Sequence, residues 1–130
     1  DKDGDKDLYV TSGSSEFPGA STDLIDRLYI NDGQGNFSKV NKVYPVEAFE
    51  SNSVVVAEDF DKDGDQDLFV GGRMVAMQYG LPANSYLLRN DGRGNFTDAT
   101  REIAPMLASL GLVTDALWSD VDRDGQRDLI

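Results

Sequence analysis

The segment Asp59–Leu68 constrains this chain more than any other, because it places an aspartate at every second position and a glycine after the third. In an extended loop this alternation turns the side chains toward one point, and the glycine permits a sharp reversal. Calcium takes about six to eight oxygen ligands from carboxylates, backbone carbonyls and water. Counting from position 1 of the loop, we predict side-chain ligands at Asp59, Asp61, Asp63 and Asp67, and a backbone carbonyl ligand at Asp65.

The same pattern occurs twice more. One copy consists of Asp120, Asp122, Asp124, Gln126 and Asp128, and an incomplete copy consists of Asp1, Asp3, Asp5 and Asp7, whose first ligand is expected upstream of residue 1. Gln126 stands at position 7, where only the backbone carbonyl is needed. Thirteen of the nineteen aspartates lie in these three loops, so the acidity is concentrated rather than spread along the chain.

Two other interpretations of these loops were weighed. Asp and Gly favour turns without any metal, but a turn needs one or two aspartates, and four or five close carboxylates would repel one another without a cation. An EF-hand loop begins in the same way but needs a bidentate glutamate at position 12. That position holds Val70, and Val10 in the first copy, so the EF-hand interpretation fails twice.

The net charge of −12 excludes the partners that attract basic patches, namely nucleic acid and anionic membrane surfaces. Three bound calcium ions would bring it to about −6 (−12 plus three times +2). No apolar run is long enough for membrane insertion. Cysteine is absent, which excludes disulfides and a thiolate metal site. Since only the roughly millimolar calcium outside cells fills weak sites constitutively, we expect an exported protein.

An internal repeat organises the chain. The calcium loop recurs from Asp1 to Asp61 to Asp122, which are offsets of 60 and 61 residues. A second motif, Asn-Asp-Gly-x-Gly-Asn-Phe, occurs in 28–37 and again in 87–96, an offset of 59. Two motifs that share one period of about 60 residues indicate a solenoid or a propeller.

Each repeat is predicted to contain four short strands. In the complete copy these are residues 54–57, 68–70, 86–88 and 96–99. The Asn-Asp-Gly motif is interpreted as a structural hairpin turn between the last two. The strands are apolar at consecutive positions, which is typical of a sheet covered on both faces. The predicted fold is therefore all-β, with four-stranded antiparallel sheets as β-propeller blades and Trp118 in the core between blades.

Longer connections are expected at 13–25, 41–52, 73–84 and 101–113, with a helical turn over 105–111. In up-and-down sheets they lie at the end opposite the calcium loops and hairpin turns. Binding residues are often found on such connections. Arg73, Met74, Met77 and Tyr79 combine a cation with apolar groups, which suits a partner or a sugar, or packing against a neighbouring blade.

These residues resemble the FG-GAP/VCBS-type repeats of integrin α-subunit propellers and of many bacterial surface proteins. The Asn-Asp-Gly-x-Gly-Asn-Phe element is more similar to the bacterial VCBS branch, including proteins with an ASPIC/UnbV segment. The resemblance implies calcium between the first two strands of each blade, held by the same aspartates, on the face away from the ligand-binding loops. It also implies a fragment of a seven-bladed propeller: a repeat lacking its first strand (1–52), a complete repeat (53–113) and the start of a third (114–130).

The expected function is a calcium-binding scaffold for extracellular binding or adhesion, secreted or at the surface of a bacterium. Its expected partners are calcium ions, neighbouring blades, and a protein or glycan ligand at the loops opposite the calcium loops. The alternative is part of a propeller-containing polysaccharide-active enzyme. The chain has no histidine and no distinctive pair of carboxylates outside the loops, so no catalytic residue is predicted. A spacer without any ligand is a third interpretation.

Overall fold

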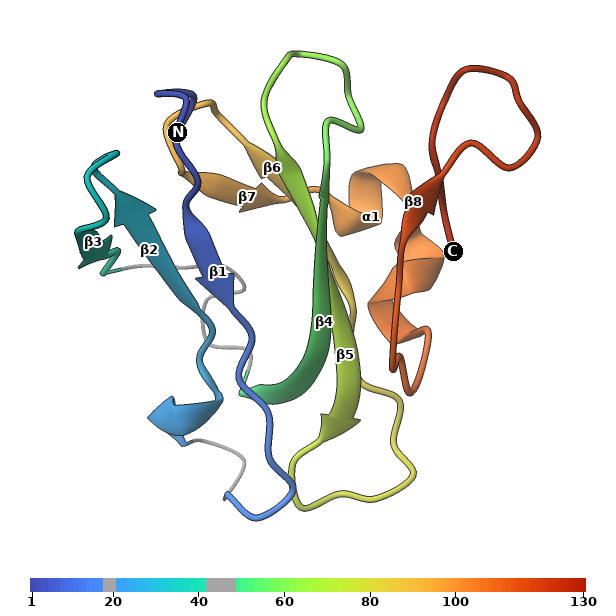
Figure 1. Cartoon of the computed structure of the whole chain (residues 1–130). Coiled ribbons are helices and arrows are strands. Elements are labelled where there is room, and N and C mark those ends of the chain that lie inside the picture. The colour runs from blue at the N-terminus through green and yellow to red at the C-terminus, as the bar shows by residue number, and fades with distance from the viewer. Residues whose placement is uncertain (18–20, 42–48) are drawn as a thin grey trace.

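The computed structural model describes residues 1–17, 21–41 and 49–130, and its described strands form three antiparallel sheets (Figure 1). The first sheet contains β1 (Leu8–Val10), β2 (Arg27–Asn31) and β3 (Phe37–Lys39), and the second contains β4 (Glu50–Glu58), β5 (Asp67–Val75), β6 (Tyr86–Asn90) and β7 (Phe96–Asp98). The third pairs β8 (Trp118–Ser119) with β9 (Asp128–Leu129). Strands that follow one another in sequence are neighbours in each sheet, as predicted for blades.

The loops divide between the two ends of the sheets, as the up-and-down topology requires. Figure 1 shows the β4–β5 loop, the β8–β9 loop and the β6–β7 turn at the end where the N-terminus lies. The β1–β2 and β5–β6 connections lie at the opposite end. Residues 18–20 and 42–48, which belong to two of the predicted connections, lie outside the described residues.

The middle sheet carries the core. Leu68, Phe69 and Val70 follow one another in β5 and all are buried, so this strand is covered on both faces. Leu68 and Val70 form a cluster with Leu88 of β6, and Tyr9 of the neighbouring sheet packs against it. The run of consecutive apolar residues therefore has the explanation predicted from the sequence.

Three strands, β4, β5 and β6, are longer than predicted, and β6 ends at Asn90 instead of residue 88. β5 continues to Val75 through Gly71 and Gly72, beyond the strand predicted at residues 68–70. A Cβ on Gly72 would lie 2.0 Å from the carbonyl oxygen of Asn84, so this glycine permits close approach of a neighbouring chain segment rather than a turn. β4 correspondingly begins at Glu50, three residues before the predicted start of the second repeat at 53, because it pairs with the extra length of β5.

Two short helices occupy the connection after β7. The helical turn expected near Pro105 is present as a 3-10 helix, Pro105–Ser109, whereas α1 (Thr100–Ile103) was not predicted. The carboxylate of Asp98 accepts hydrogen bonds from the backbone N–H and the hydroxyl of Thr100, the first residue of α1. In the next sheet, Trp118 is half-buried on β8, which lies beside β4.

A buried carboxylate links the first sheet to the second. Asp26 is 4% exposed; its Oδ1 accepts the backbone N–H of Ser12 at 2.7 Å, and its Oδ2 accepts the hydroxyl of Tyr9 and the amide of Asn52 at 3.0 and 2.9 Å. The backbone N–H of Asn52 also donates to the carbonyl of Ser12. Asn52 belongs to β4, so Asp26 and Ser12 together join neighbouring blades.

The next junction repeats part of this arrangement one period later. The backbone N–H of Val113 donates to the carbonyl of Gly72 at 3.0 Å, and the N–H of Gly72 donates to the hydroxyl of Ser85. Ser85 therefore stands where Asp26 stands in the first blade. The backbone contact between blades is repeated, while the side chain that supports it differs.

We predict that Asp26→Asn has a pH-dependent effect on stability. Burial raises the pKa of the Asp26 carboxyl above its usual range, so the folded state keeps this proton to higher pH than the unfolded state, whose pKa is about 3.9. The contribution of Asp26 to the free energy of unfolding then falls as the pH rises above about 4. Asn does not titrate. The free energy of unfolding of the wild type minus that of the variant, measured by urea unfolding, should fall from pH 4 to pH 7. A constant or rising value would contradict the prediction.

Candidate metal centres

The β4–β5 loop brings three of its predicted ligands together. Carboxylate oxygens of Asp59, Asp61 and Asp67 all lie within 4.8 Å of one another. Oxygens bound to one calcium at about 2.3–2.6 Å are at most about 5 Å apart, so these three fit one coordination sphere. Asp63 lies outside this group, and its Oδ1 accepts the backbone N–H of Asp65 at 3.0 Å.

The β8–β9 loop shows a related cluster. Carboxylate oxygens of Asp120, Asp122 and Asp124, all exposed, lie within the same distance of one another. Gln126 donates its side-chain amide to Asp124, and Asp128 accepts the backbone N–H of Val121 at 3.0 Å. The clusters of the two loops thus share positions 1 and 3 and differ in their third carboxylate. The full ligand set of each stays a prediction.

The incomplete first loop is arranged differently. No group of three carboxylates among Asp1, Asp3, Asp5 and Asp7 reaches this proximity in the described structure. Oδ1 of Asp3 accepts the backbone N–H of Asp5 at 3.2 Å. Desolvation, followed by the charges of Asp3 and Asp7, raises the pKa of the Asp5 carboxyl. Metal binding by this copy therefore rests on its sequence pattern.

Backbone donors hold the carboxylates of the loops in place. Asp59 accepts the N–H of Gly64 at 3.0 Å, and Asp120 accepts that of Gly125 at 3.1 Å, so position 1 reaches across each loop to position 6. An ionised carboxylate has about four lone-pair sites, so these bonds leave room for a metal. The donor set, several carboxylates preorganised by backbone N–H groups, fits a hard divalent cation.

Asp67 also connects the metal loop to the hairpin turn. It is fully buried; its Oδ1 accepts the backbone N–H of Asn90 at 2.8 Å, and its Oδ2 accepts that of Phe60 at 3.2 Å. The side chain of Asn90 donates in return to the carbonyl of Gln66. Burial raises the pKa of Asp67, and the nearby charge of Asp61 raises it further.

The first blade has the same pair of hydrogen bonds. Oδ1 of Asp7 accepts the backbone N–H of Asn31, and the side chain of Asn31 donates to the carbonyl of Lys6. Sequence reasoning treated the loop and the turn as separate motifs. Their shared period of about 60 residues was the signal that the two motifs work together.

The aspartate of the turn is engaged inside the turn. Oδ1 of Asp91 accepts the backbone N–H groups of Arg93 and Asn95, and Oδ2 accepts the side-chain amide of Asn95 at 2.9 Å. These bonds, led by the amide of Asn95, lower the pKa of the Asp91 carboxyl. Asp32 has the same set of partners in the first blade. The structural role predicted for this motif agrees with these contacts.

Ion pairs connect the metal loops to their surroundings. Lys2 Nζ lies 2.7 Å from Oδ1 of Asp65, which joins the first loop to the second. Asp65 is buried and its carboxylate is occupied by this contact, which is compatible with the predicted use of its backbone carbonyl alone. Arg127 Nε lies 3.4 Å from Glu58, so the second and third blades are joined at the same end. Local sequence spacing does not predict these pairs, because their members are 63 and 69 residues apart.

Comparison with known proteins adds the family. The sequence model of the FG-GAP-like repeat family matches residues 1–70, more than half of the chain. The chain belongs to the FG-GAP-like repeat family. No curated protein and no solved structure gives a match. Beyond residue 70, the FG-GAP-type arrangement continues in the structure, because the β6–β7 turn and the β8–β9 loop repeat features of the matched region.

FG-GAP repeats form propeller blades, which identifies the three sheets as blades and the chain as a propeller-like scaffold. Such repeats are typical of extracellular proteins. Across the residues that the structure describes, no helix has the length and apolar character needed to cross a membrane.

We predict that Asp67→Asn destabilises the chain even in calcium-free buffer. The amide places a donor where two backbone N–H groups now find acceptors, and one of them is left buried without a partner. The expected loss is about 2 kcal/mol of the free energy of unfolding, measured by urea denaturation with chelator present. Asp128→Asn, at the same position of the exposed third loop, is the matched control and should cost far less. Equal losses in the free energy of unfolding would show that the buried hydrogen bonds of Asp67 contribute no more to stability than the exposed one of Asp128.

The ion pair between loops is tested by comparing Lys2→Gln with Lys62→Gln. Both lysines stand at the same position of their loops, with left-handed φ values of 69° and 64°, so the backbone effect of the substitution is matched. Of these two lysines, Lys2 forms an ion pair among the described residues and Lys62 forms none. We expect Lys2→Gln to lower the melting temperature more than Lys62→Gln at low salt, and the gap to narrow near 1 M salt, where charges are screened. A gap that salt does not change would argue against the ion pair.

Proposed function

We propose that this chain is a calcium-stabilised part of a propeller that serves as an extracellular binding or adhesion scaffold. The observation that carries the proposal is the convergence of Asp59, Asp61 and Asp67 between β4 and β5. Bound there, calcium would supply a positive charge shared by carboxylates that otherwise repel one another. Calcium is proposed over magnesium because the loops offer many carboxylates, whereas magnesium prefers to keep several waters.

The proposed role of the metal is structural. Several carboxylates and a backbone carbonyl would occupy most coordination positions, which leaves little room for a substrate. The loop joins β4 to β5 and is hydrogen-bonded to the β6–β7 turn, where the backbone N–H of Asn90 donates to Asp67. A cation in the loop would therefore stiffen one whole end of the blade. We propose no catalytic role for these residues; the absence of histidine supports binding rather than catalysis.

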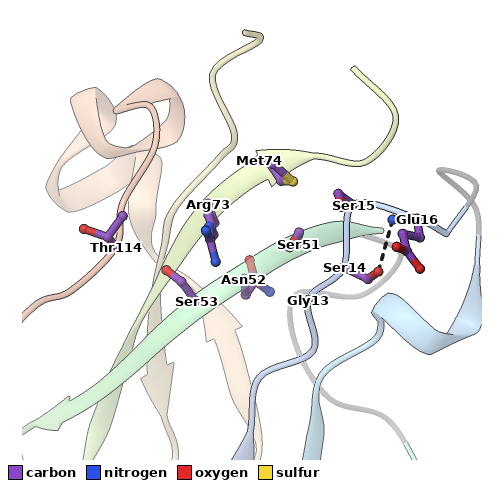
Figure 2. Close-up of a pocket in the computed structure, with 10 residues that line it drawn as sticks. All are labelled: Gly13, Ser14, Ser15, Glu16, Ser51, Asn52, Ser53, Arg73, Met74 and Thr114. Atoms are coloured by element: carbon purple, nitrogen blue, oxygen red, sulfur yellow. Dashed lines mark hydrogen bonds between the residues drawn. The ribbon is translucent and has the colours of Figure 1, made fainter. Parts of the chain in front are cut away.

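The proposed ligand site lies at the other end of the sheets. Figure 2 shows a pocket between the β1–β2 connection, the start of β4, the end of β5 and Thr114. Its volume of about 550 Å³ is in the range of small-ligand sites. Rigid blades would hold these loops in place for a protein or glycan partner. Bacterial secretion is part of the proposal, because calcium outside cells would keep the metal loops filled.

Calcium titration into chelator-treated protein tests the metal. We expect binding heat and a higher melting temperature, with a gain of about 2.7 kcal/mol in the free energy of unfolding for each site at about a hundred times its Kd. Magnesium at the same concentration should give a smaller gain.

The site is located with Asp61→Asn, which should remove one binding event. Asp115→Asn removes the same charge from an exposed position outside the loops and should leave calcium binding unchanged. Absence of both heat and stabilisation in the wild type, or equal losses in the two variants, would refute the proposal.

A further inference from the structure

We infer that the pocket opposite the metal loops binds a carboxylate-bearing sugar, with Arg73 pairing the carboxylate and the surrounding polar groups binding the sugar hydroxyls. The inference rests on the proposed function, since it names the ligand class for the binding face of the scaffold. It is carried by the side chains that line the pocket and by one buried acceptor without a partner.

The pocket is rich in hydroxyl groups. Five of its lining side chains are Ser14, Ser15, Ser51, Ser53 and Thr114, contributed by three separate stretches of the chain (Figure 2). Each hydroxyl both donates and accepts, as sugar hydroxyls do. Ser53 already donates to the carbonyl of Val113 at 2.7 Å, so its oxygen retains acceptor capacity. A lining of this kind complements a polyol better than an apolar ligand.

Asn52 supplies a buried acceptor. The residue is 5% exposed, and its Nδ2 donates to Oδ2 of Asp26 at 2.9 Å, which fixes the orientation of the amide. Its Oδ1 is buried and has no hydrogen-bond partner among the described residues. In Figure 2 this oxygen points to the side of the pocket where Arg73 lies. Buried polar atoms nearly always have partners, so a ligand hydroxyl directed at Asn52 would satisfy an acceptor that the chain leaves open.

Arg73 supplies the charge. It lies at the end of β5 with an exposed side chain, and no carboxylate of residues 1–17, 21–41 or 49–130 forms an ion pair with it. A guanidinium matches a carboxylate through two parallel hydrogen bonds. On a chain with net charge −12, an arginine in a pocket that has no ion-pair partner in the part of the chain that the structure describes is a specific attraction for an anion.

Glu16 restricts which anion fits. Its carboxylate lies on the far rim of the pocket from Arg73 in Figure 2, and its backbone N–H donates to the hydroxyl of Ser14. The Glu16 carboxylate can accept hydrogen bonds from sugar hydroxyls, but it repels additional negative charge on the ligand. A doubly charged phosphate is therefore disfavoured relative to a ligand with a single carboxylate. A site that offers a cation to the ligand's acid group and acceptors to its hydroxyls is complementary to a uronic acid residue.

The test is NMR titration of the calcium-loaded chain with three small probes. Methyl glucuronoside carries both the acid and the hydroxyls, methyl glucoside lacks the acid, and cyclohexanecarboxylate has a single acid group without the hydroxyls. We expect the glucuronoside to bind at least about tenfold more tightly than either of the other two, with shifts at Asn52, Arg73 and Thr114. Equal or tighter binding of cyclohexanecarboxylate would overturn the sugar assignment, and equal binding of the glucoside would overturn the role of charge.

Variants locate the contact. Arg73→Gln should weaken glucuronoside binding by about tenfold or more, and Arg73→Lys should weaken it less, because the charge remains while the paired geometry is lost. Arg93→Gln removes an exposed arginine at the opposite end of the blade and should leave the affinity unchanged. An equal loss in Arg93→Gln would show general charge attraction and overturn the site. If calcium stabilises the chain but the glucuronoside does not bind, this inference fails and the proposed scaffold stands; if calcium has no effect, the scaffold proposal fails on its own test.

Discussion

The second blade depends on the buried carboxylate of Asp67. It receives backbone N–H groups from the metal loop and from the hairpin turn, so two segments with irregular backbone are anchored on one side chain at the end of β5. A buried charge of this kind is costly unless it is hydrogen-bonded, and carboxylate oxygens of Asp59 and Asp61 lie within 4.8 Å of those of Asp67, with Asp61 paired to Arg89. A cation in the loop would relieve the repulsion among these carboxylates. The stability of the blade and its affinity for a metal are therefore coupled through one group.

The two ends of the sheets differ in chemistry. At one end, carboxylates gather in loops that are stiffened by backbone hydrogen bonds and joined across blades by Lys2 and Arg127. At the other end, the blades approach closely at Ser12 and Asn52, and a hydroxyl-rich pocket opens beside this junction, with an arginine that forms no ion pair among the described residues. A scaffold stiffened at one end and open to ligands at the other is consistent with the proposed function.

Much of this arrangement could be predicted because it depends on local pattern. The order of the strands, the antiparallel topology and the division of loops between two ends follow from the repeat of about 60 residues and from the apolar runs around Val55, Phe69 and Leu87. Strand length could not be predicted in the same way. The predicted strand ends at residue 70, whereas in the structure Gly71 and Gly72 continue it and allow close approach to Val113 and Asn84, which only the assembled blades bring near.

The sequence by itself determined the fold class, the repeat and the aspartate loops, because each depends on residues that are close together in the chain. The tertiary structure decided how the loops are used. It grouped Asp59 with Asp61 and Asp67, and it directed the side chain of Asp65 toward Lys2. It also placed Asn52 against Asp26 and beside Arg73, residues separated by more than twenty positions. Contacts of this kind depend on how one blade packs on the next, which local spacing does not encode.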